Sequence, residues 1–140
     1  MDDMDRRSVM GVGLTVTAVT PLLFLATSAQ AREYGADEGT EIAPGVRWVD
    51  LGEGHSDIPA YRSIKIGDAV YQPGAGTPEA LMDNDMVCTI LAGEFAIKQG
   101  DQEFTVKEGD VYSCGKGRPE ESKNTSSVVG VHRIALLIPA

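Results

Sequence analysis

Short apolar runs separated by glycine-containing turns constrain the fold of this chain more than any other feature. Strand-like runs lie at residues 46–51, 60–74, 86–98, 103–114 and 128–138. After the first 31 residues, no segment shows the period of about 3.6 residues that is typical of an amphipathic helix. Many short strands between turn signals are typical of a β-sandwich or a β-barrel. The pattern therefore predicts an all-β class and a single domain.

Turn residues divide these runs further. We expect the run at 60–74 to break at Gly67-Asp68, and the run at 86–98 to break at Ala92-Gly93. Gly100-Asp101 is expected at the centre of a hairpin turn, and Gly109 within the turn of a strand pair at 103–114. Residues 52–59 and 115–127 contain few apolar side chains, and we predict that both are loops.

The first 31 residues differ from the rest in composition. Arg6 and Arg7 precede an apolar run at 9–26, and small residues at 29 and 31 follow it in the pattern of a signal cleavage site. The run is short for a membrane span, so we interpret residues 1–31 as an export signal. The paired arginines resemble a twin-arginine signal, and a membrane-anchoring helix is the alternative.

Export predicts a periplasmic or extracellular location, with no stable membrane anchor once the signal is removed. The mature chain would then begin near Arg32 with a flexible lead over 32–45. An oxidising compartment would allow a disulfide between Cys88 and Cys114, and two buried free thiols are the alternative. The net charge of -9 argues against nucleic acid as a partner, because phosphates require clustered Lys and Arg.

Two glycine-anchored motifs in this sequence resemble those of the cupin superfamily, which consists of small jelly-roll barrels. The first motif is anchored on Gly74 and Gly93, and the second contains Gly109, Gly117 and Asn124 at the family's spacing. The resemblance extends from about residue 61 to 138. It implies an RmlC-like double-stranded β-helix over residues 46–140.

The resemblance also identifies four positions at which cupins usually place three histidines and one glutamate as metal ligands. In this chain those positions hold Ala80, Met82, Met86 and Glu120. A hard divalent metal prefers imidazole and carboxylate, so we predict no metal site of the usual type and no cofactor. Copper is an alternative, because Met82, Met86 and Cys88 are soft ligands that share a strand face if the turn at 83–85 keeps the register. The other interpretation is that these side chains only fill the core.

An acid–base pair is a further hypothesis. Alternation along residues 131–138 places His132 on the inner face of the last strand and Arg133 on the outer face. His132 would then face Glu120 inside the barrel, where each group shifts the pKa of the other. Tyr71 and Tyr112 are expected to add phenol donors. The alternative is a structural histidine with satisfied hydrogen bonds.

These residues support several functions. The main prediction is a barrel that binds a small organic ligand in a pocket lined by Met82, Met86, Cys88, Tyr112, Glu120 and His132. The first alternative is a metal-independent isomerase, epimerase or lyase with Glu120 and His132 as catalytic residues, and the second is a copper protein. Cupins commonly dimerise, so the resemblance also implies a homodimer, and strand 46–51 with Trp48 is the edge we expect to pair.

Overall fold

A computed structural model of the chain describes residues 32–140, which fold as ten β-strands. Residues 1–31, and with them the predicted export signal, lie outside this described part. Among residues 32–140 no helix is long and apolar enough to cross a membrane. Neighbouring strands of both sheets pair in antiparallel fashion, which confirms the predicted all-β class.

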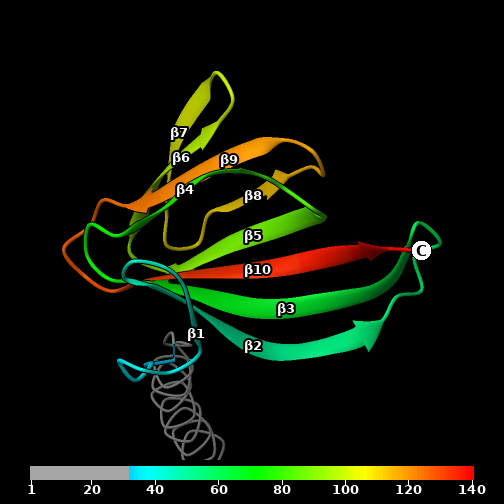
Figure 1. Ribbon diagram of the computed structural model, residues 1–140, viewed down its shortest axis with the longest axis horizontal. Coiled ribbons are helices and arrows are strands. Elements are labelled where there is room, and N and C mark those ends of the chain that lie inside the picture. The colour runs from blue at the N-terminus through cyan, green and yellow to red at the C-terminus, as the bar shows by residue number, and fades with distance from the viewer. Residues whose placement is uncertain (1–31) are drawn as a thin grey trace, which may run out of the picture. The chain divides into compact units, whose positions relative to one another are not determined.

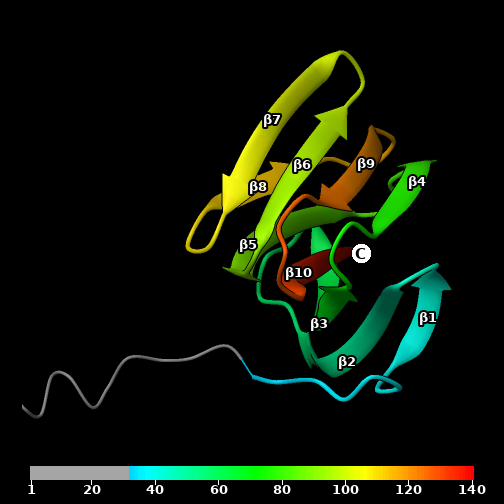
Figure 2. The same ribbon diagram turned by 90° about the vertical axis from the view of Figure 1, so that its left-hand side faces the viewer.

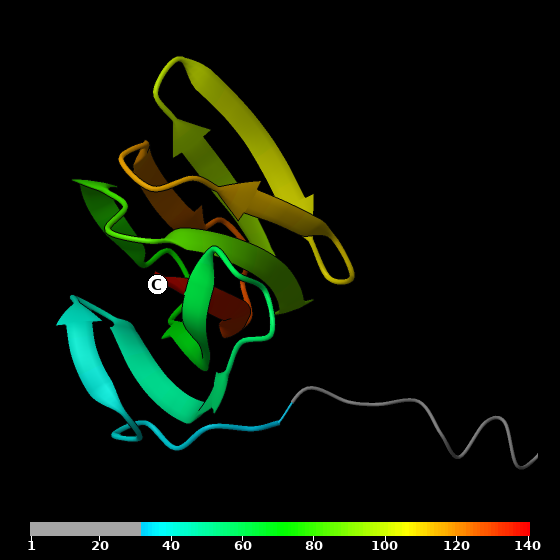
Figure 3. The ribbon, with the colours of Figure 1, turned by 90° about the vertical axis from the view of Figure 1, so that its right-hand side faces the viewer.

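The strands form two sheets that face each other (Figure 1). The larger sheet has six strands in the order β1 (Thr40–Ala43), β2 (Val46–His55), β3 (Tyr61–Tyr71), β10 (Gly130–Pro139), β5 (Asp85–Ala92) and β8 (Val111–Cys114). The smaller sheet has four strands in the order β4 (Gly76–Leu81), β9 (Pro119–Asn124), β6 (Glu94–Gln99) and β7 (Gln102–Lys107). Figures 2 and 3 show the two layers from opposite sides, with β4 above β1 and β2.

The core lies where alternate side chains of the two sheets meet. Phe95 and Ile97 from β6 are almost completely buried against Ile90 of β5. Tyr71 of β3 packs edge-on against Phe95, with ring centroids 4.9 Å apart. Side chains of this size each contribute about 1.5–3 kcal/mol when they leave water, so this end of the barrel carries much of the stability.

Strand β10 ends the chain and yet lies in the middle of the larger sheet. It pairs with β3 on one side and with β5 on the other. Across the first of these pairs, Arg133 donates two hydrogen bonds to the fully buried carboxylate of Asp68, at 2.8 and 3.0 Å. Arg133 lies on the outer face as predicted, and this ion pair fixes the register between β3 and β10.

Two strand boundaries were wrong because contacts distant in sequence decide them. Strand β3 runs unbroken through Gly67-Asp68, although both residue types favour turns. The ring of Trp48 occupies the space beside Gly67, where an added Cβ would lie 2.1 Å from the ring. Strand β2 continues to His55 along β3, so only part of the predicted loop at 52–59 is a loop.

The predicted loop at 115–127 was also wrong in its middle part, where residues 119–124 form β9. Glu120, Ser122 and Asn124 alternate inward along β9 and are all buried. Apolar alternation could not reveal this strand, because its inward side chains are polar. The predicted strand pair at 103–114 separates into β7 and β8, which belong to different sheets.

The segment that we described as a flexible lead, 32–45, contains strand β1. Arg47 holds the residues just before β1, because it donates hydrogen bonds to the backbone carbonyl groups of Asp37, Glu38 and Gly39. The Tyr34 hydroxyl also donates to Asp68. Because β1 pairs with β2, the strand that carries Trp48 is not the sheet edge that we expected. The homodimer itself stays a prediction.

Candidate ligand-binding cavity

A cavity of about 350 Å³ lies between the two sheets. Its apolar wall comes mainly from the larger sheet and consists of side chains of Ile42, Trp48, Met86, Ile134 and Leu136. Strands β4 and β9 of the smaller sheet supply the opposite wall, which is more polar. A mostly apolar pocket with a few convergent polar groups is typical of small-molecule sites.

Three hydroxyl groups form one polar group of this cavity. The Ser122 hydroxyl lies 2.6 Å from the Tyr71 hydroxyl and 2.8 Å from the Thr77 hydroxyl. All three side chains line the cavity, and they come from β9, β3 and β4. Hydroxyl groups both donate and accept, so this cluster matches either a donor or an acceptor on a bound molecule.

The second polar group joins Glu120 to His132 through a tyrosine. The Tyr112 hydroxyl donates to Glu120 Oε1 at 3.2 Å and lies 3.0 Å from His132 Nε2. Gln99 donates to the other Glu120 oxygen at 2.8 Å. Glu120 and His132 are only 6% and 1% exposed, so both depend on these partners.

Burial sets the charge of this group. It lowers the pKa of His132 to about 4, and it raises the pKa of the Tyr112 hydroxyl far above its ordinary value. His132 is therefore neutral near pH 7. Because the Tyr112 proton is directed to Glu120, the tyrosine oxygen is left to accept a hydrogen bond from a protonated Nε2 of His132. The buried Nδ1 is then an acceptor for which residues 32–140 provide no partner.

The predicted pocket residues lie close together, but not all of them line the cavity. Met82, Met86, Glu120 and His132 line the cavity. Tyr112 and Cys88 are not among its lining side chains; Tyr112 contacts the polar pair, and Cys88 packs beside Met86. Burial, followed by the charge of Glu120, raises the pKa of the Cys88 thiol to about 12.

The sequence did not predict several residues that line the cavity, including Trp48, Thr77, Ser122, Ile134 and Leu136. Ile134 and Leu136 were placed on the inner face, but they were not assigned to the pocket. The inward alternation of Glu120, Ser122 and Asn124 was the available signal for Ser122. It would have required recognising a strand whose buried face is polar.

The four positions assigned to metal ligands by resemblance all line this cavity, and Ala80 lies opposite Glu120 across β4 and β9. Together they offer one carboxylate and two thioethers. This donor set does not fit a hard divalent ion, which prefers oxygen and imidazole ligands. Within residues 32–140, no three His, Cys, Asp or Glu side chains are grouped so that they could hold a metal ion.

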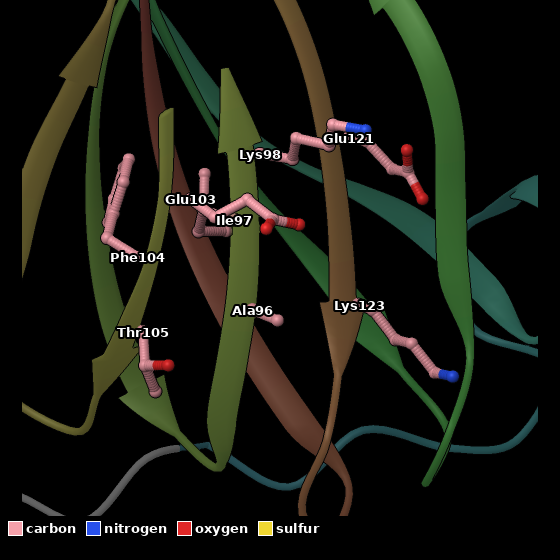
Figure 4. A pocket seen from close by; sticks show the side chains of 8 residues that line it. All are labelled: Ala96, Ile97, Lys98, Glu103, Phe104, Thr105, Glu121 and Lys123. Atoms are coloured by element: carbon pink, nitrogen blue, oxygen red, sulfur yellow. The ribbon is translucent and has the colours of Figure 1, made fainter. Parts of the chain in front are cut away.

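A second depression, of about 440 Å³, lies on the outer face of β9, β6 and β7 (Figure 4). Lys98 stands there opposite Glu103 on one neighbouring strand and Glu121 on the other. Opposite charges on adjacent strands stabilise a solvent-facing sheet surface. No buried polar side chain lines this depression, so the cavity between the sheets is the better candidate.

No protein-family model and no curated protein matches this sequence. Solved structures do match it. An RmlC-like cupin from Shewanella frigidimarina is 15% identical with a TM-score of 0.59, and the match covers 80% of this chain and 93% of that one. A cupin superfamily protein from Desulfitobacterium hafniense is 20% identical with a TM-score of 0.54, covering 79% and 84%.

A third structure, an RmlC-like cupin family protein with a double-stranded β-helix fold from Methanocaldococcus jannaschii, is 16% identical. Its TM-score is 0.54, and the match covers 79% of this chain and 92% of that one. Likeness at these identities establishes the fold alone. Residues 32–140 therefore have the cupin-type double-stranded β-helix fold that the glycine motifs indicated.

The lowered pKa of His132 predicts a specific dependence of stability on pH. The unfolded chain binds a proton at this histidine below about pH 6.5, whereas the folded chain does so only near pH 4. The stability that neutral His132 contributes is therefore present above pH 6.5 and is lost as the pH falls toward 4. The free energy of unfolding, measured with urea, falls in the unmodified protein as the pH is lowered from about 7 to 4.5. In His132→Gln this fall should be smaller by about 2 kcal/mol.

His55→Gln is the matched control, because it changes the only other histidine, an exposed one. It should follow the pH dependence of the unmodified protein. If His132→Gln follows that same dependence, then His132 is not held neutral by burial.

Proposed function

We propose that this domain binds a small organic molecule in the cavity between its sheets. The observation that carries the proposal is the pairing of an apolar wall around Trp48 with two buried polar groups, one centred on Ser122 and one on Glu120. Such a cavity favours the binding of a ligand that has both an apolar body and a hydrogen-bonding group. We further propose, from residues 1–31, that the chain is exported and binds this ligand outside the cytoplasm.

The polar groups restrict the ligand further. Glu120 accepts hydrogen bonds from Gln99 and Tyr112, and a carboxylate retains further lone pairs for a ligand donor. A carboxylate in the cavity wall disfavours an anionic ligand, because like charges repel strongly away from water. A neutral molecule with a hydroxyl or N–H donor and an aromatic or aliphatic body fits best.

A second candidate function is metal-independent proton transfer. The Tyr112 hydroxyl contacts both Glu120 and His132, which is the specific observation in its favour. Glu120 would accept a proton from a carbon next to a carbonyl group, and the hydrogen bonds of Tyr112 to Glu120 and His132 would hold the carboxylate in position. Isomerases and epimerases require a base of this kind within hydrogen-bonding reach of the substrate.

Ligand binding can be tested with N-phenyl-1-naphthylamine, a neutral aromatic probe with one N–H donor that fluoresces in apolar surroundings. Trp48 is the only tryptophan in the chain and lines the cavity, so energy transfer from it reports binding at this site. We expect saturation at one probe per chain. Ala80→Phe, which adds a ring to the cavity wall, should weaken binding about tenfold or more.

Ala96→Phe makes the same change on the exposed outer face of β6 (Figure 4) and should bind the probe as the unmodified protein does. The proposal fails if the unmodified protein shows no saturable binding, or if the two substitutions affect affinity equally.

Proton transfer can be tested with dihydroxyacetone, a neutral hydroxyketone, in heavy water. If Glu120 is a base, mass spectrometry should detect deuterium uptake faster than in buffer. Glu120→Gln should lower the rate about a hundredfold, and His132→Gln, which changes only the group that holds Tyr112, should lower it less. Glu121→Gln, which changes the neighbouring outward-facing carboxylate, is the control. Uptake no faster than in buffer, or equal in all variants, would exclude this candidate for hydroxyketones.

A further inference from the structure

Every sulfur-containing side chain of residues 32–140 belongs to a single cluster. The chain has five methionines and two cysteines, and three of the methionines precede residue 11. The remaining four residues, Met82, Met86, Cys88 and Cys114, pack together beside the cavity, and we refer to them as the sulfur cluster. Met and Cys are common core residues, but here the core around Phe95 at the other end of the barrel contains neither.

Strand pairing defines the arrangement of the sulfur cluster. Met86 on β5 lies opposite Cys114 on β8, and Cys88 lies two residues further along the same buried face of β5. Met82 follows β4, and its backbone is fixed by hydrogen bonds with Arg118 and Gly117, at 3.0 and 2.7 Å. The four side chains thus come from three separate segments that the sheet holds in a fixed relation.

The two thiols are neighbours without forming a disulfide. Cys88 lies opposite Tyr112, and Cys114 lies opposite Met86, so the two cysteines are diagonal partners across β5 and β8. Diagonal partners have Cα atoms about 7–8 Å apart, beyond the usual reach of a disulfide. Both cysteines are free and buried in the structure, and two thiols and two thioethers remain available.

We propose that the sulfur cluster binds one Cu(I) ion, with Cys114 as a ligand in addition to Met82, Met86 and Cys88. Thioethers are poor ligands for Zn²⁺ and for hard cations, whereas Cu(I) accepts both thioether and thiolate sulfur. Met82 and Met86 also line the cavity, which gives an ion a route from solvent to the two cysteines behind them. Nearby Glu120 adds a negative charge that favours a cation.

Coordination replaces a sulfur–hydrogen bond by a copper–sulfur bond. Each thiol that binds Cu(I) releases its proton to solvent, so coordination by Cys88 and Cys114 releases two protons per ion and leaves the site with one net negative charge. No electron is transferred, because copper enters and remains as Cu(I). Failure of copper binding and failure of organic-ligand binding can be distinguished, because Cys88 and Cys114, which copper needs, do not line the cavity that holds the probe.

The test is an anaerobic titration of the purified protein with Cu(I) in the presence of bathocuproine disulfonate, a chelator that becomes coloured when it holds Cu(I). We expect the protein to withdraw one Cu(I) per chain from the chelator. Met86→Leu preserves the shape of the side chain but removes its sulfur, and it should weaken the affinity about tenfold or more. Cys114→Ala should weaken it further.

Ser113→Ala is the matched control, because Ser113 neighbours Cys114 on β8 but is exposed. It should bind Cu(I) as the unmodified protein does. Circular dichroism spectra and urea unfolding establish whether Met86→Leu and Cys114→Ala remain folded. No withdrawal of Cu(I), or equal affinity in Met86→Leu, Cys114→Ala and Ser113→Ala, would overturn the proposal. Tighter binding of Zn²⁺ than of Cu(I) would also overturn it.

Discussion

The position of β10 between β3 and β5 is the constraint on which the rest of the structure depends. Strand β10 lies in the middle of the larger sheet. The sheet is therefore complete only when β10 has paired with both β3 and β5, which precede it in the sequence. The Asp68–Arg133 ion pair fixes its register. With that register, His132, Ile134 and Leu136 face the cavity, opposite Glu120 and Ser122 on β9.

The sequence allowed the class and much of the framework of the fold to be predicted, because turns and alternation are local properties. The turn between β5 and β6 is an example: Gly93 has a φ of 84°, and a Cβ there would lie 3.0 Å from Gly130. The errors arose where distant contacts decide the structure. Trp48 covers Gly67 and keeps β3 continuous, and β9 buries polar side chains that resemble a loop in sequence.

Part of the candidate site could also be predicted, because the direction of a side chain along a strand is a local property. Alternation was sufficient to place Met86 and His132 inward, and the resemblance placed Met82 and Glu120 beside them. Neither alternation nor the resemblance could show that Tyr112 lies between Glu120 and His132, because these side chains from β8, β9 and β10 meet only in the folded barrel. The sulfur cluster also required the structure, since the pairing of Cys114 with Met86 depends on the register of β5 and β8.

The central claim is that the space between the sheets is a binding cavity with Met82 and Met86 in its wall. It is tested most directly by the NMR spectrum of protein labelled with ¹³C in the methionine methyl groups, recorded during a titration with N-phenyl-1-naphthylamine. The account predicts that the signals of Met82 and Met86, assigned by Met→Leu substitution, shift together and saturate, because the rings of the probe lie beside them. Unchanged positions of both signals at saturating probe would contradict it.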